Sequence, residues 1–170
     1  MKKLAFLMLI AVLVLGLIAS AVVAGGPANK ATGSIWLDVV NDDWNRYMEF
    51  DAHAEKDGRP AKGTICWYQW LGPEELLEII DPSFELEVKY VRVDDGTAWF
   101  AAGPDHRDYW LVVQVLDGGT PATGGDEVDL VWVTIGGTAG EDRAEEIVKD
   151  GETLDSVYTS IGGNLVVHFK

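Results

Sequence analysis

Apolar and polar residues alternate with a period of two along much of this chain. Every second residue is apolar from Met48 to Ala54 and again from Phe84 to Tyr90. Successive side chains of a β-strand point to opposite faces, so this period predicts strands with one buried and one solvated face. Segment 110–116 is apolar on both faces apart from Gln114, which indicates a central strand covered on both sides. The pattern therefore predicts an all-β fold.

Turn sequences separate the expected strands. Asp94-Asp95-Gly96 is a strong hairpin signal. Lys56-Asp57-Gly58 and Asp117-Gly118-Gly119 contain residues that tolerate the positive φ angles of tight turns. Closely spaced strands without long helices between them favour an antiparallel β-sandwich or a closed barrel of eight or nine strands. The expected strand segments are 31–39, 47–54, 63–70, 84–90, 96–102, 110–116, 127–132 and 164–169.

Two segments interrupt the strand pattern. Gly72–Ile80 has a proline near its start and acidic residues close behind it, and Pro82 follows its end. These signals predict one or two helical turns. Gly140–Lys149 is polar and charged with few apolar positions, so it is either a short helix or a solvated excursion before the last strand. Neither segment indicates a second domain.

The first 24 residues have the three-part pattern of an export signal. Lys2 and Lys3 precede an apolar run from Leu4 to Leu17, and mostly small residues lead to Ala24. This order is typical of a cleavable signal peptide. The alternative is a retained anchor, because the apolar stretch to Ala24 is just long enough to span a bilayer. We predict a signal peptide over residues 1–24, a flexible linker over 25–30, and a single secreted or periplasmic β-domain over 31–170.

The charge balance and the single cysteine limit what the domain can do. The chain has 28 acidic and 13 basic residues and a net charge of −15. Such a surface disfavours nucleic acids and anionic membranes, and it keeps a secreted protein soluble. Cys66 has no second cysteine with which to form an internal disulfide, so the domain depends on its hydrophobic core. Its apolar strand context favours a buried small hydrophobe over a catalytic thiol.

Several short motifs, taken in order, resemble a family of bacterial domains. They are Ala31-Thr32-Gly33-Ser34, Met48 to Ala54 followed by Gly58 to Gly63, a strand around Leu86 to Val91 followed by Gly96 to Gly103, Leu116 to Gly119 leading to Gly125 to Val128, and Gly162 to His168. Together they resemble the secreted bacterial post-choice-of-anchor-protein domains, over nearly the whole chain after the signal. The resemblance implies an extracytoplasmic β-domain for which no enzyme activity is established.

A glycine-rich segment with carboxylates at both ends is the candidate metal site. Asp117 precedes it, and Asp126 and Asp129 follow. Calcium takes about six to eight oxygen ligands from carboxylates and backbone carbonyls, and glycines let carbonyls turn inward. The alternative is a hairpin loop with aspartates at ordinary turn positions, because the Asp-x-Asp-x-Asp-Gly pattern is absent. Calcium is the one cofactor considered, and both interpretations stay open here.

Two tryptophans are the candidate ligand-binding residues. The chain has seven tryptophans, several of which must belong to the core. Trp44 and Trp70 adjoin polar or loop segments, where exposure is expected. An exposed indole beside carboxylates suits stacking on a sugar. The alternative for both is partial burial at the rim of the sandwich or barrel.

Other catalytic and metal motifs are weak or missing. His53, His106 and His168 lack the close spacing of a zinc site, so a structural role is favoured, including hydrogen bonds of His53 and His168 to neighbouring strands. The sequence contains neither a Gly-x-Ser-x-Gly elbow nor a phosphate-binding loop. Nothing singles out one pair of carboxylates for hydrolysis.

Three functions therefore stay open at this level. The first is a secreted, non-enzymatic interaction or surface module with an unidentified extracellular partner. The second is a protein that binds a carbohydrate or a small apolar molecule through a tryptophan-lined face or a barrel mouth. The third is a hydrolase that uses two carboxylates. A module predicts a filled core without a deep pocket, a binder predicts a concave site with exposed tryptophans, and a hydrolase predicts facing carboxyl groups.

Overall fold

Eight antiparallel strands and two helices make up the part of the chain that the computed structural model describes, which is residues 29–39, 42–54, 61–118 and 126–168. The elements are β1 (Asn29–Asp38), β2 (Asn45–Ala54), β3 (Lys62–Trp70), the 3-10 helix η2 (Glu74–Ile79), β4 (Phe84–Asp94), β5 (Thr97–Ala102), β6 (Trp110–Leu116), β7 (Glu127–Val133), α2 (Gly137–Asp150) and β8 (Thr159–His168). The prediction of an all-β fold with a short helical insert is confirmed.

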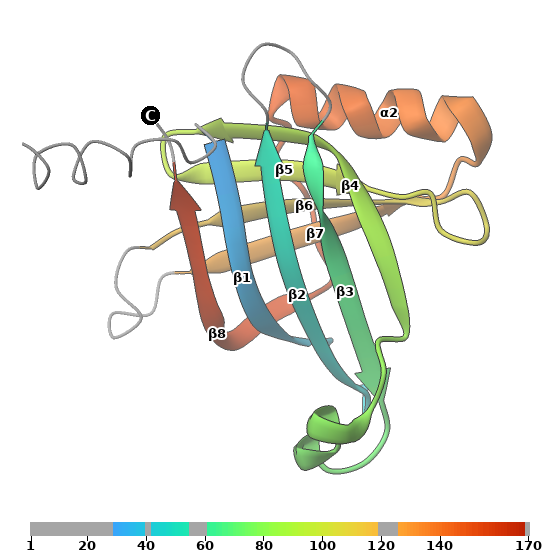
Figure 1. Cartoon of the computed structure of the whole chain (residues 1–170), viewed down its shortest axis with the longest axis vertical. Helices are drawn as coiled ribbons and strands as arrows, with labels where there is room; N and C mark the ends of the chain where they lie inside the picture. Colours follow the sequence, from blue (N-terminus) through green and yellow to red (C-terminus); the bar gives the residue numbers. More distant parts are fainter. Residues whose placement is uncertain (1–28, 40–41, 55–60, 119–125, 169–170) are drawn as a thin grey trace, which may run out of the picture.

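The strands form a single sheet with the order β7-β6-β5-β4-β3-β2-β1-β8. Consecutive strands are neighbours except β8, which crosses to the far edge and pairs with β1. The sheet curls into a half-barrel in which β1–β3 lie opposite β5–β7 (Figure 1). β4 forms the corner, because it pairs with β3 through its first half and with β5 through its second half.

The hairpin between β4 and β5 follows directly from the sequence. Asp95 and Gly96 both have positive φ, 44° and 79°. Two successive residues with positive φ give a turn whose twist matches that of the flanking strands. The predicted Asp94-Asp95-Gly96 hairpin is therefore confirmed. The expected turn at Lys56-Asp57-Gly58 lies outside the described residues.

Inward-facing side chains from all eight strands fill the concave side of the sheet. They include Ile35, Phe50, Trp67, Val88, Phe100, Val113, Leu130 and Val167. The Phe50 and Phe100 rings come from opposite halves of the curl, and their centroids are 5.1 Å apart. The alternating pattern thus supplies one continuous core, as expected for strands with one buried face.

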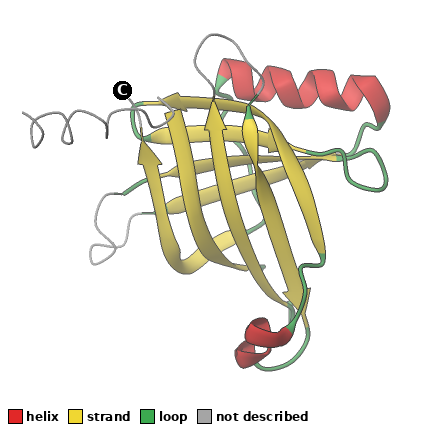
Figure 2. Ribbon diagram, in the orientation of Figure 1, coloured by secondary structure: helices red, strands yellow, loops and turns green. Residues whose placement is uncertain are grey.

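A second core lies on the outward face of β5–β7. Trp110 and Val112 pack there against Ala144, Ile147 and Val148 of α2. This contact explains why segment 110–116 is apolar on both faces and confirms that it is a covered central strand. Figure 2 shows α2 lying outside the curled sheet, whereas η2 projects at one end.

The structure resolves the two interpretations of Gly140–Lys149 in favour of a helix. α2 runs from Gly137 to Asp150, and its buried apolar residues Ala144, Ile147 and Val148 pack against the sheet. Gly151 ends it in the left-handed conformation, with φ of 65°, and donates its N–H to the carbonyl of Ile147 at 3.0 Å. A β-carbon at Gly151 would also lie 3.1 Å from the Arg92 guanidinium, so glycine serves both the cap and the packing.

Several strand boundaries differ from the prediction, and β4 for example continues to Asp94 rather than ending at residue 90. β1 begins at Asn29, so the last two residues of the expected 25–30 linker belong to the strand. β8 begins at Thr159 rather than at residue 164, because β1 provides a partner for a segment without apolar alternation. Within the part of the chain that the structure describes, no helix is long and apolar enough to cross a membrane. The predicted signal peptide lies outside that part.

Candidate functional site: a pocket at the mouth of the half-barrel

The sheet opens where β4 separates from β3. The ladder between them joins Thr64–Trp67 to Phe84–Glu87 only, while β4 continues to Asp94 beside β5. A β-bulge between Val88 and Tyr90 turns β4 at this point. The start of β3 is therefore not joined to the second half of β4, and the half-barrel has a mouth here.

A pocket of about 700 Å³ occupies this opening, and we call it the mouth pocket. Its lining consists of Asn29, Ala54, Ala61, Lys89, Tyr90, Val91, Arg92, Val93, Glu141, Glu145, Val148 and Lys149. The start of β1, the end of β2, the residue before β3, the second half of β4 and one face of α2 thus contribute to it. Val91 and Val93 pack against the interior core, so the pocket lies directly above the filled part of the half-barrel.

Two hydrogen bonds hold α2 against β4 at the wall of the mouth pocket. The Tyr90 hydroxyl donates to Glu141 Oε1 at 3.0 Å, and Arg92 Nη1 donates to the carbonyl of Lys149 at 2.5 Å. Burial, together with the Glu141 carboxylate, raises the pKa of Tyr90 to about 12. Tyr90 is therefore a neutral donor across the physiological range. These two hydrogen bonds therefore hold α2 in place as one wall of the mouth pocket.

The lining of the mouth pocket combines charged side chains with apolar ones. Arg92 and Lys149 each reach a carboxylate as well, Asp94 at 3.0 Å and Glu145 at 2.5 Å. Exposed pairs of this kind are weak, so both cations can still attract an anionic group. Arg92 also lies 5.5 Å from the centre of the Trp99 ring, which fixes the position of its guanidinium.

The opposite end of the half-barrel is closed. Trp67 stacks on Phe84 with centroids 5.8 Å apart and meets the Tyr158 ring edge-on at 5.5 Å. Arg46 is buried beside Tyr158 and donates to Asp42 at 2.5 Å. That hydrogen bond and the Trp44 backbone N–H hold the pKa of Asp42 below its usual range. Aromatic side chains and the Arg46–Asp42 pair thus fill this end of the half-barrel in the part of the chain that the structure describes.

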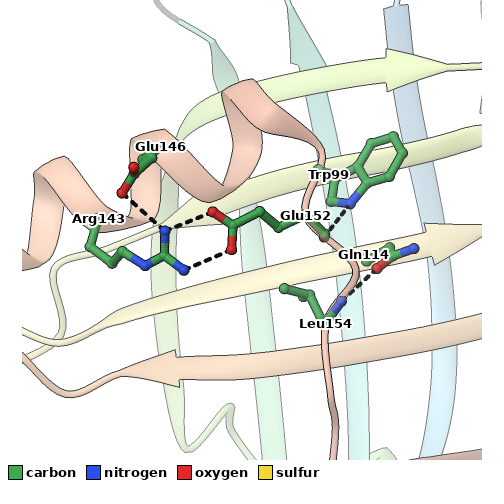
Figure 3. A network of polar contacts seen from close by, with 6 residues as sticks. All are labelled: Trp99, Gln114, Arg143, Glu146, Glu152 and Leu154. Carbon is green, nitrogen blue, oxygen red and sulfur yellow. Dashed lines mark hydrogen bonds and ion pairs between the residues drawn. The ribbon is translucent and has the colours of Figure 1, made fainter.

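The segment from α2 to β8, residues 151–158, crosses the outward face of β5–β7 and is tied down by side chains (Figure 3). Trp99 Nε1 donates to the carbonyl of Glu152 at 3.0 Å, and the Leu154 N–H donates to Gln114 at 3.0 Å. Arg143 of α2 donates to both carboxylate oxygens of Glu152 at 2.7 Å each. These contacts fix α2 and hence the wall of the mouth pocket.

Two of the three predicted calcium ligands hydrogen-bond to the free edge of β8. Asp117 accepts the Val167 N–H at 3.0 Å. Asp126 accepts the Leu165 N–H at 3.3 Å and the Gly118 N–H at 3.1 Å. The β6–β7 connection thus closes the seam between β7 and β8 with side chains instead of a backbone ladder.

The third predicted ligand, Asp129, lies elsewhere. It is on the outward face of β7 in register with Gln114, and burial together with Glu127 and Asp155 raises its pKa. Among the described residues no group of three or more histidine, cysteine or carboxylate side chains is placed to hold a metal ion. Residues 119–125 lie outside those described, and calcium binding stays a prediction.

The two predicted ligand-binding tryptophans have different environments. Trp44 is exposed, with 41% of its surface accessible. Trp70 is buried at 7%, and its indole N–H donates to the carbonyl of Pro73 at 2.9 Å. The expectation of exposure was therefore wrong for Trp70, because the insert containing η2 folds back over it. The centroid of its ring lies 5.6 Å from that of Trp36 on the outward face of the sheet.

The histidines do not form a site. His53 and His168 are both in register with Lys30, so β1 lies between their strands. His53 Nδ1 lies 3.6 Å from Asp51 Oδ1. His106 is exposed in the connection between β5 and β6.

Cys66 was interpreted as buried in the core, but it lies half-buried on the outward face of β3. It is in register with Glu49 on one side and Glu85 on the other. Burial first, and then Glu85 and Glu49, raise the pKa of the thiol. Because the thiolate is the reactive form, the thiol is expected to be unreactive near neutral pH.

Alkylation of Cys66 by iodoacetamide at pH 8 is therefore expected to be slower than that of glutathione. The rate should rise only at a higher pH than for a free thiol, since the raised pKa delays ionisation. Glu85→Gln removes a negative charge beside the sulfur and should speed the reaction, whereas Glu87→Gln, in register with Thr64, should not. A rate equal to that of glutathione, unchanged by Glu85→Gln, would contradict this account.

The mouth pocket was missed at the level of sequence. Its lining comes from separate short stretches, and small residues such as Ala54 and Ala61 have no chemical signature. One signal was present, because the inward apolar positions shift from even numbers up to Val88 to odd numbers at Val91 and Val93. That shift marks the bulge that opens the mouth.

Comparison with known proteins found no matching family model, no similar curated protein and no similar solved structure, so the resemblance to post-choice-of-anchor-protein domains stays a prediction.

Proposed function

We propose that this chain is a non-enzymatic binding protein that works outside the cytoplasm and holds a small molecule in the mouth pocket. The observation that carries the proposal is the pocket itself, an opening of about 700 Å³ above a filled core. Binding sites for small molecules typically measure about 300–1,000 Å³ and are often located at the mouths of β-barrels.

The lining of the pocket supports a ligand with two chemically distinct parts. Ala54, Val91 and Val93 offer an apolar surface for a hydrocarbon body. Arg92 and Lys149 stand at the rim and suit a carboxylate or another anionic group. An amphipathic anion is therefore the ligand class that we propose.

The hydrolase alternative has less support. It requires two carboxyl groups facing each other across a cleft, one of them with a raised pKa. Asp129 has a raised pKa, but it does not line the mouth pocket. Glu141 and Glu145 do line it, but both belong to α2 and so do not face each other across the pocket. Glu141 accepts a hydrogen bond from Tyr90, and Glu145 pairs with Lys149.

Titration calorimetry with decanoate tests the proposal, because decanoate joins an apolar chain to a carboxylate. We expect 1:1 binding in the micromolar range. Ala61→Trp places a large ring inside the pocket and should weaken binding by at least about tenfold, which corresponds to about 1.4 kcal/mol. Ala139→Trp adds the same ring at an exposed position of α2 outside the lining and should have no effect.

A second comparison tests the role of the rim charges. Decyltrimethylammonium has the same apolar chain with a cationic head and should bind more weakly than decanoate, because Arg92 and Lys149 repel it. Two results would rule out the mouth pocket as the binding site. One is the absence of binding heat with decanoate at millimolar concentration, and the other is an equal loss of binding in Ala61→Trp and Ala139→Trp.

A further inference from the structure

Four aromatic side chains gather on the outward face of β1–β3, and we call them the outer aromatic cluster: Trp36, Tyr47, Tyr68 and Trp70. Trp36 is in register with Tyr47, and Tyr47 with Tyr68, so these three cross the sheet in one row. Their ring centroids are 5.0 Å and 5.8 Å apart. Trp70 supports the row from its buried position, 5.6 Å from Trp36.

This cluster is unusual for its position. The solvated face of an antiparallel sheet ordinarily carries polar side chains. α2 and residues 151–158 cover the outward face of β5–β7, while Figure 1 shows the outward face of β1–β3 without a covering helix. Trp36, Tyr47 and Tyr68 are all half-buried by one another and still offer aromatic surface to the solvent.

The cluster is open on the side of β8. Trp36 is in register with Gly162, which has no side chain to cover the indole. A β-carbon built at Gly162 would meet nothing within 4 Å. The row therefore continues into free space, where a chain-like ligand can pass over its end.

A parallel row of hydrogen-bonding groups borders the cluster. Two residues away along their strands, Asn164, Ser34 and Glu49 line up across β8, β1 and β2. The Tyr68 hydroxyl donates to Glu49 at 3.4 Å and links the two rows. Aromatic faces next to hydroxyl, amide and carboxylate groups match a sugar, which has apolar C–H faces and hydroxyls at its edges.

The surrounding charge narrows the class of ligand. Glu49 and Glu85 lie in the bordering row, whereas Lys30 and Lys62 stand at the far ends of their strands. A polyanion such as a nucleic acid or an acidic glycan would be repelled. We infer that the outer aromatic cluster binds a neutral oligosaccharide chain, at a site separate from the mouth pocket.

Affinity electrophoresis in native gels containing hydroxyethylcellulose tests this inference. The protein should be retarded by this neutral glycan and not by polygalacturonate. Trp36→Ala should weaken the retardation about tenfold, as read from the dependence of mobility on glycan concentration. Tyr109→Ala, which removes a half-buried surface tyrosine outside the cluster, should leave it unchanged.

A second variant keeps the inference testable if Trp36→Ala fails to fold. Gly162→Arg fills the free space beside Trp36 without touching the core, and its guanidinium can stack on the indole and take the place of the sugar. It should abolish retardation while the circular dichroism spectrum stays unchanged. No retardation of the folded wild-type protein, or retardation that survives both variants, would overturn the inference. Ala61→Trp should not alter retardation, so a failure of the mouth pocket and a failure of this site can be told apart.

Discussion

Replacing Phe100 with alanine is expected to lower the free energy of unfolding by about 3–5 kcal/mol. The ring is fully buried and lies 5.1 Å from the Phe50 ring, at the point where the two halves of the half-barrel meet. Alanine would remove the apolar contacts and leave a cavity that neighbours on paired strands cannot collapse to fill. Urea unfolding followed by tryptophan fluorescence measures the loss as a lower midpoint at unchanged slope.

Val157→Ala is the control for this experiment. Val157 is an apolar side chain with 72% of its surface accessible, so its truncation should change the free energy of unfolding by less than about 0.5 kcal/mol. If Phe100→Ala were equally mild, the interior of the half-barrel would not be the packed core described here, and a ligand would have room inside it.

The second large effect is expected at the seam between β7 and β8. Asp126→Ala removes the acceptor for the N–H groups of Leu165 and Gly118. An amide left without a partner in a partly buried place costs about 1–3 kcal/mol, and the Leu165 amide is part-buried. We expect a loss of about 2 kcal/mol in the free energy of unfolding, together with faster hydrogen exchange at Leu165.

Glu127→Ala is the matched control, because it removes the same charge from the next residue, which is exposed on β7. It should leave both stability and exchange nearly unchanged. Faster exchange throughout β8 in both variants would mean that net charge, and not the carboxylate at the seam, governs this edge.

Strands such as β2 could be predicted because they have one face in the core and the other toward solvent. The period of two therefore appears in the sequence wherever a strand crosses the half-barrel, as from Met48 to Ala54. Segment 110–116 was predicted to be covered on both sides because it is apolar on both faces, although the sequence did not show that α2 provides the cover. The first half of β8 was missed, since Gly162 and Gly163 leave no apolar alternation to read.

The contacts that depend on the path of β8 could not be predicted. Asp117 and Asp126 were considered as calcium ligands because only their spacing was visible. Their partners, Val167 and Leu165, come close only because β8 crosses to the β1 edge of the sheet. Trp70 was likewise expected to be exposed. It is buried instead, and its indole N–H donates to the carbonyl of Pro73, three residues further along the chain.

The most direct test of the mouth pocket is to map a ligand on the amides of the ¹⁵N-labelled domain. Decanoate should shift the resonances of Val91, Val93 and Lys149, which line the pocket. Amides beside the closed end, such as that of Trp67, should stay unchanged. Shifts confined to the closed end or to the outward face of β1–β3, with β4 and α2 unaffected, would contradict the proposal that the mouth of the half-barrel is where this protein binds its ligand.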